Sequence, residues 1–262
     1  MTAIPQGRTR RRTVLAGAVC ALVVTSAGLS GCDEDPDAGT NGVGKLAADE
    51  IQAKAKAAAG AAGAVRLSGT VVAGGRSYKL DMRLKANGGS GTVTAQGSSF
   101  QLLRVGEELY LKADAGFWKH QSAEDSEDSK DSEGGGGKDT DAADKLDGKY
   151  VKVPTGDPSY KKFSGFTDKD LLLDSLLTLH GSLGKDGHQE DPASGARTIR
   201  ISGGGGSGGT LDVALEGQPY PLRLVRAGDA GTLSFSAWGE NFALAEPAKD
   251  ETVDYGKELP TS

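Results

Sequence analysis

Short runs of alternating apolar and polar side chains recur from residue 64 onward and predict β-strands. In the clearest run, Leu80, Met82 and Leu84 alternate with charged residues, and a similar alternation occurs over 220–225. A period of two places successive side chains on opposite faces of a sheet. Further strands are expected at 65–71, 91–95, 100–105, 109–112, 149–153, 197–201, 210–215 and 232–238.

Two segments have a helical pattern instead. Residues 45–62 are mostly good helix formers, with Ile51 and a series of alanines as the apolar side. Leucines recur at spacings of three and four over 171–179, with Thr167 placed to cap the helix and Gly181 just beyond its end. Both helices are expected to be amphipathic.

The order of these elements predicts the fold class. Helix, strands, helix and strands follow one another without the strand–helix alternation that builds parallel sheets. Glycine-rich turns at 74–75 and 87–89 suit tight hairpins. We therefore expect an α+β fold in which helices cover one face of a curved antiparallel β-sheet.

The N-terminus has the pattern of an export signal. Four arginines between residues 8 and 12 precede an apolar run over 14–29, which is short for a permanent membrane span. Leu29, Ser30, Gly31 and Cys32 then resemble the lipobox of bacterial lipoproteins. The resemblance implies that residues 1–31 are a signal peptide and that Cys32 carries a diacylglycerol.

The cysteine count supports lipidation over the alternative of an ordinary thiol near a cleavage site. Cys20, the other cysteine, lies inside the signal and is removed with it. The mature chain then has no internal disulfide and no thiolate cluster for zinc. Two or more acyl chains on Cys32 would anchor the protein firmly to a membrane.

The export route stays open between two alternatives. Arg11 and Arg12, followed by Thr13, Val14 and Leu15, resemble a twin-arginine signal, which would imply export in a folded state. A general secretory signal that is rich in arginine fits the same residues.

The mature chain divides by composition into four parts. Residues 32–44 are short, acidic and glycine-rich and are expected to be a flexible tether. Residues 45–255 form a single domain that contains an acidic insertion at 120–148, and 256–262 are a C-terminal tail. The insertion has ten acids, three lysines and almost nothing to bury, so we expect disorder. Calcium binding is disfavoured because no Asp-x-Asp-x-Asp-Gly loop is present.

The charge balance argues against nucleic acid as a partner. The formal net charge is −6, and loss of the four signal arginines leaves the mature chain near −10. Phosphate backbones require a basic surface. Anionic lipid surfaces would also repel the chain, so membrane attachment depends on the acyl chains at Cys32.

Three segments carry a resemblance to a known family. Residues 217–224, 231–240 and 104–113, in this order of elements and behind a lipobox, resemble the LppX/LprG-type lipoproteins of actinobacteria. That family is similar in fold to LolA-like carriers, a half-barrel with helices in its concave face. The resemblance implies a lipid or lipoglycan ligand. Envelope proteins are the other candidate partners, and the acyl chains on Cys32 predict a location on the outer face of the cell membrane.

The apolar positions of the sheet and the second helix have two interpretations. They either pack as a dry core or leave part of the interface open as a pocket for acyl chains. Periodicity alone does not separate the two, and the pocket is implied by the resemblance. The candidate pocket residues are Leu80, Met82, Leu84, Leu172, Leu176, Leu179, Leu222, Leu224 and Phe235.

No catalytic constellation is expected. Residues 205–209 satisfy Gly-x-Ser-x-Gly around Ser207, but a hydrolase elbow requires a strand before it and a helix after it, and a strand follows here. His120, His180 and His188 have no spacing that places two on one helix face. We therefore expect neither enzyme activity nor a cofactor or metal.

Two functions from different classes remain. The favoured one is an envelope lipoprotein that binds an apolar or lipid-like ligand, for lipid transport or envelope biogenesis. The alternative is a structural or regulatory interaction module without a lipid-sized cavity, for which the acidic insertion would recruit partners.

Overall fold

The structure is a computed structural model that describes residues 35–118 and 143–254. The chain divides into two compact units, 1–35 and 36–262, and nearly all described residues belong to the second. The predicted signal peptide, Cys32, the tail at 256–262 and most of the acidic insertion lie outside the described residues.

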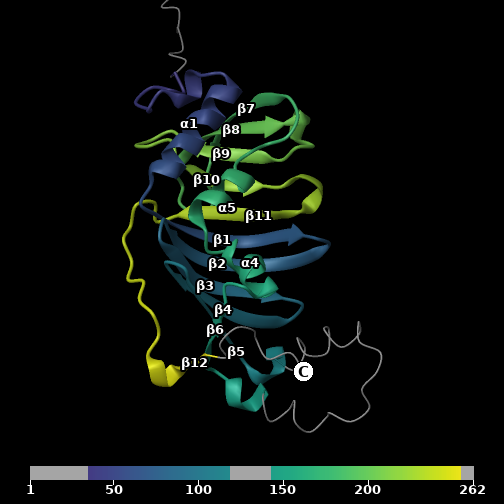
Figure 1. Cartoon of the computed structure of the whole chain (residues 1–262). Coiled ribbons are helices and arrows are strands. Elements are labelled where there is room, and N and C mark those ends of the chain that lie inside the picture. Colours follow the sequence, from purple (N-terminus) through teal and green to yellow (C-terminus); the bar gives the residue numbers. More distant parts are fainter. Residues whose placement is uncertain (1–34, 119–142, 255–262) are drawn as a thin grey trace, which may run out of the picture. The chain divides into compact units, whose positions relative to one another are not determined.

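The second unit is built on one large sheet (Figure 1). Its strand order is β12-β6-β5-β4-β3-β2-β1-β11-β10-β9-β8-β7, and all neighbours are antiparallel except β12 and β6. The two edge strands do not pair with each other, so the sheet is unclosed. The strands are β1 (Ala64–Ala73), β2 (Arg76–Lys85), β3 (Gly88–Ala95), β4 (Ser98–Val105), β5 (Glu108–Ala113), β6 (Tyr150–Val153), β7 (Leu183–Glu190), β8 (Arg197–Gly203), β9 (Thr210–Ala214), β10 (Pro221–Val225), β11 (Gly231–Ser236) and β12 (Thr252–Asp254).

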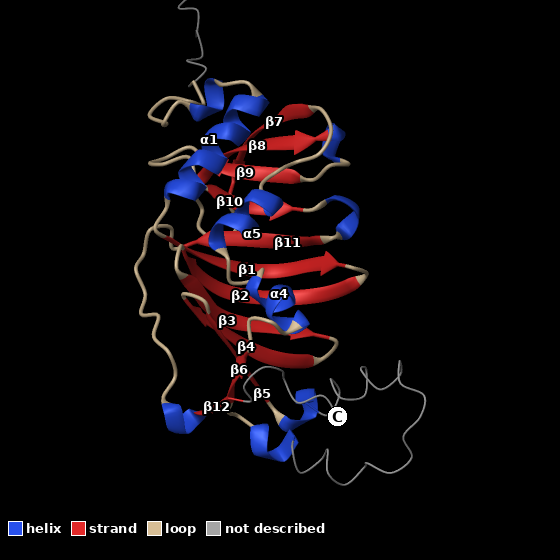
Figure 2. Cartoon of the chain, in the orientation of Figure 1, coloured by secondary structure: helices blue, strands red, loops and turns tan. Residues whose placement is uncertain are grey.

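The main helices lie over the same face of this sheet (Figure 2). They are α1 (Ala48–Ala61), α4 (Pro158–Ser164) and α5 (Lys169–Leu176). Four short 3-10 turns are η1 (Val43–Lys45), η2 (Gly204–Gly206), η3 (Ala227–Asp229) and η4 (Lys249–Glu251). The predicted α+β class, with helices on one face of an antiparallel-rich sheet, is confirmed.

The register of the strands explains the core. Residues directly opposite one another form a row that crosses nine strands on the helix-covered face, and all of them except Gly69 are buried. Helix α1 packs here through Ile51, Ala55 and Ala59, which are spaced by four and fully buried. The row consists of Ile201, Leu211, Leu224, Leu233, Gly69, Leu80, Val93, Phe100 and Ala113.

Helix α5 differs from the predicted helix at both ends. Asp168, not Thr167, is the cap, and its side chain accepts a hydrogen bond from the backbone N–H of Leu171 at 3.0 Å. The buried Thr167 hydroxyl instead donates to the carbonyl of Ser164 at 2.9 Å. The helix ends at Leu176, so Leu179 is buried outside it.

The folded unit begins before the expected boundary at residue 45. Within the segment 32–44, predicted to be a flexible tether, Val43 is buried in η1, and the backbone N–H of Asn41 donates to the carbonyl of Leu215 at 2.8 Å. One large apolar side chain and this bond therefore attach the end of that segment to the sheet.

Residues 143–148, at the end of the predicted acidic insertion 120–148, lie within the described part of the chain. Residues 143–146 are helical, and Ala143 and Leu146 are buried in the core. The backbone N–H of Gly148 donates to the carbonyl of Ala113 at 3.0 Å. Because Ala143 and Leu146 stand among many acidic residues, the composition of the segment did not indicate that they pack in the core.

Candidate ligand site between helices α1 and α5

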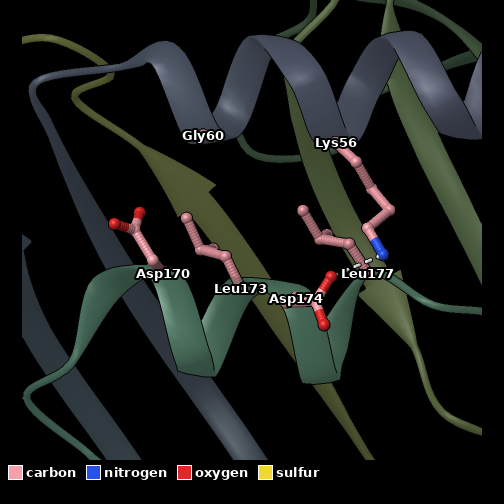
Figure 3. A pocket seen from close by; sticks show the side chains of 6 residues that line it. All are labelled: Lys56, Gly60, Asp170, Leu173, Asp174 and Leu177. Atoms are coloured by element: carbon pink, nitrogen blue, oxygen red, sulfur yellow. Dashed lines mark ion pairs between the residues drawn. The ribbon is translucent and has the colours of Figure 1, made fainter.

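A hollow of about 350 Å³ lies between α1 and α5 (Figure 3). This volume falls at the lower end of the range of about 300–1,000 Å³ for small-molecule sites. The lining side chains come from one face of each helix. They are Lys56, Gly60, Asp170, Leu173, Asp174 and Leu177.

Helical spacing brings these residues together. Lys56 and Gly60 are four residues apart and therefore share one face of α1. Asp170, Leu173 and Asp174 of α5 and its C-cap Leu177 recur at three and four, which also places them on one face. Gly60 contributes space, because a Cβ added there would meet no atom within 4 Å.

The inner wall of the hollow is apolar. Leu173 and Leu177 are both buried, and the aliphatic stem of Lys56 approaches from α1. A surface of this kind favours hydrocarbon over water. The hollow therefore combines an apolar wall with charged groups at its rim.

Lys56 bridges the two helices at one end. Its Nζ lies 2.7 Å from Asp174 Oδ1 and donates to Thr178 Oγ1 at 2.9 Å (Figure 3 shows the ion pair). Nearby, Gln52 Oε1 accepts from the backbone N–H of Leu179 at 3.0 Å. These contacts hold the C-terminal end of α5 against α1.

Lys169 bridges the helices at the other end. Its ammonium donates to the carbonyl of Gly60 at 3.1 Å and lies 2.6 Å from Asp170 Oδ1, while the side chain is only 3% exposed. The Gly60 carbonyl belongs to the last turn of α1, where carbonyls lack helical partners and the helix dipole is negative. This environment compensates for burying the lysine.

The structure places the nine candidate pocket residues in or beside the core between sheet and helices. Leu172 and Leu222 are half-buried, and the other seven are buried. None of the nine lines the α1–α5 hollow, although Leu172 and Leu176 are sequence neighbours of the lining leucines. Their role as ligand contacts stays a prediction.

Two other hollows occur among the described residues. One of about 270 Å³ is lined partly by Thr92, Gln101 and Lys112, which are register neighbours on β3, β4 and β5. Another of about 50 Å³ adjoins Arg66 and Arg83. The first lining combines Phe100 and Ala113 with polar side chains, and the second includes Phe242 beside the two arginines.

The groups singled out for chemistry lie apart from the hollow. Ser207 is in the connection between β8 and β9, and its hydroxyl donates to the carbonyl of Gly204 at 2.7 Å. His188 Nε2 lies 3.0 Å from Asp37 Oδ1, while His180 is exposed beyond α5. His120 lies outside the described residues. Within residues 35–118 and 143–254, no three His, Cys, Asp or Glu side chains gather as a metal site.

Gly60 is the part of the site that sequence reasoning missed. A glycine inside an alanine-rich helix costs about 1 kcal/mol relative to alanine, so it calls for a packing explanation. The sequence did not single out Lys56 or Lys169 either, because their partners on the other helix are distant in sequence.

No helix in the described ranges is long and apolar enough to cross a bilayer.

The chain matches no protein family and no curated protein in sequence. Among solved structures it is similar to LprF from Mycobacterium bovis, with 16% identity, a TM-score of 0.49, and 77% of this chain and 97% of LprF covered. It is also similar to lipoprotein LppX of Mycobacterium tuberculosis, with 15% identity, a TM-score of 0.41, and coverage of 75% and 99%.

A third similar structure is an uncharacterized conserved protein from Thermus thermophilus. It shares 13% identity with this chain at a TM-score of 0.36, over 79% of this chain and 98% of that protein. The sequence identity is low in all three comparisons.

Proposed function

We propose that this chain is a lipid-anchored extracytoplasmic envelope protein that binds an apolar or lipid-like ligand between its sheet and helices, without catalysing a reaction. The observation that carries the proposal is the α1–α5 hollow, which joins a leucine wall to a charged rim. Amphiphilic molecules match that combination of surfaces. Lipid transport or envelope biogenesis is the context that the resemblance to LppX/LprG-type lipoproteins favours.

The contacts that hold α5 in place leave room for a ligand beside Leu173 and Leu177. The helix has eight residues, its cap is Asp168, and polar bridges from Lys56 and Lys169 hold its two ends to α1. Leu173 and Leu177 lie between these bridges. A hydrocarbon chain placed against these leucines would leave the capping and bridging contacts intact.

Attachment to the outer face of the cell membrane follows from Cys32 in this proposal. The mature protein should begin at a diacylglycerol-modified Cys32, and two or more acyl chains give stable anchoring. Mass spectrometry of the N-terminal peptide should find the modified residue. A Cys32→Ala variant should leave the membrane fraction, whereas an unmodified Cys32 in the wild type would contradict the anchor.

The ligand is tested by purifying the protein from its native membrane and extracting what is bound. We expect an apolar or amphiphilic molecule to accompany the protein through repeated washing. A Leu173→Asn variant should lose it, because an amide in the wall lacks partners once hydrocarbon covers it. Leu171→Asn is the matched control, since Leu171 is the exposed leucine of the same helix.

A further inference from the structure

Both lysines at the α1–α5 hollow are already paired. Lys56 contacts Asp174 and Thr178, and Lys169 contacts Asp170 and the Gly60 carbonyl. Their ammonium groups are therefore occupied by protein oxygens. An anionic ligand would have to displace a carboxylate from one of them.

The carboxylates, in contrast, face solvent at the rim. Asp170 and Asp174 side chains are 67% and 74% exposed, while those of Lys169 and Lys56 are 3% and 31% exposed. A head group that arrives from water meets carboxylate oxygens before it meets ammonium groups. The rim thus disfavours negative charge, although its four charged groups sum to zero.

The volume limits the apolar part of the ligand. About 350 Å³ lies near the lower bound for pockets that hold drug-sized molecules. Tightly packed interiors yield little additional space without cost. One hydrocarbon chain is therefore a better fit than two.

We infer that the α1–α5 hollow takes a single-chain amphiphile whose head group carries no negative charge. The inference rests on the proposed function, which requires only some apolar ligand. The inference adds that the ligand has one hydrocarbon chain and that its head group is not negatively charged. In the bound state the chain lies against Leu173 and Leu177, and the head lies beside Asp170 and Asp174.

The experiment compares probes that share one palmitoyl chain. The full mature chain is used with Cys32→Ser, so that its own acyl groups do not compete. Monopalmitoylglycerol, palmitoyl lysophosphatidic acid and dipalmitoylglycerol are each titrated below the concentration at which they aggregate. We expect the uncharged single-chain probe to bind about 25-fold more tightly than the anionic one, because each of two unit repulsions near 4 Å in water is worth about fivefold.

Rim variants test the cause of this preference. Asp170→Asn with Asp174→Asn should improve binding of the lysophosphatidic acid by about fivefold for each carboxylate removed. Asp229→Asn, in an exposed turn remote from the lining residues, should leave the affinities for both single-chain probes unchanged. Thermal unfolding midpoints establish that each variant is folded.

The outcomes separate the inference from the function beneath it. Equal or tighter binding of lysophosphatidic acid by the wild-type chain, or tighter binding of dipalmitoylglycerol, would overturn the inference and leave an apolar site. Binding of none of the three probes would count against the proposed function as well.

Discussion

Two arginine–aspartate pairs have the same hydrogen-bond pattern but differ in burial, which should change how much each contributes to stability. Arg200 binds Asp212 through two hydrogen bonds of 2.6 and 2.8 Å, and Arg66 binds Asp81 through two of 2.9 and 2.8 Å. Asp212 is 2% exposed, whereas Asp81 is 52% exposed. Water therefore competes for the second pair and hardly for the first.

Removing the acid of each pair should separate these values. Asp212→Ala should lower the free energy of unfolding by about 3 kcal/mol, because it leaves Arg200 without its partner in a largely dry site. Asp81→Ala should cost less than about 1 kcal/mol. Urea denaturation of both variants measures the difference, and equal losses would show that burial does not govern it.

The exposed pair also predicts a pH dependence. The Arg66 guanidinium hydrogen-bonds to Asp81 and holds the pKa of that carboxyl below its ordinary value. Its contribution to stability is present above the ordinary aspartate pKa and is lost as the pH falls through the lowered one. The small stability difference between wild type and Asp81→Asn should therefore be constant near pH 7 and shrink in strong acid. A difference that grows in acid would contradict this sign.

At the scale of elements, the alternation of apolar and polar residues predicted the strands that have one buried and one exposed face. It missed the strands whose two faces are similar in polarity. Strand β7 is polar along most of its length because it is an edge strand, and β12 has three residues and pairs in parallel. Helix α4 has only seven residues and was not predicted, because its one sequence signal is the capping Asp157 before Pro158. Thr167 and Asp168 are both good caps, so the choice between them depended on the tertiary contact of Thr167 with Arg104.

The cap of α5 gives a prediction at the scale of one helix. Asp168→Ala should destabilise the protein by about 1 kcal/mol, because the N–H of Leu171 loses its acceptor. Asp168→Asn should be nearly neutral, since asparagine caps as well as aspartate. Urea denaturation compares the two variants. Equal destabilisation by both would indicate that charge, not capping, is the contribution of Asp168.

The close approach of β1 and β11 requires glycine at two positions, Gly69 on β1 and Gly231 on β11. Gly69 has φ +139°, and a Cβ there would collide with the backbone carbonyl of Thr232. Gly69→Ala should cost about 2 kcal/mol or more through backbone strain and separation of the strands. Gly63→Ala, where the added methyl meets open space, is the matched control. Thermal unfolding should show a lower midpoint for the first variant only.

For the whole molecule, the sequence predicted a sheet with helices over its apolar face but not where the packing is incomplete. The leucine pattern identified α5 as one wall, and Leu173 and Leu177 lie within it. The other wall required knowing that α1 packs beside α5, more than a hundred residues away. Candidate residues such as Met82 and Phe235 are buried, and periodicity does not distinguish core from cavity.

The central claim is that an apolar ligand occupies the hollow between α1 and α5, and native mass spectrometry of protein released from its own membrane tests it most directly. The wild type should carry about one bound molecule per chain, and Gly60→Trp should carry none because the indole fills the open space beside Leu173. Ala57→Trp, at an exposed position on the same helix, should retain the ligand. A wild type that is consistently empty, or a folded Gly60→Trp that retains the ligand, would contradict the account.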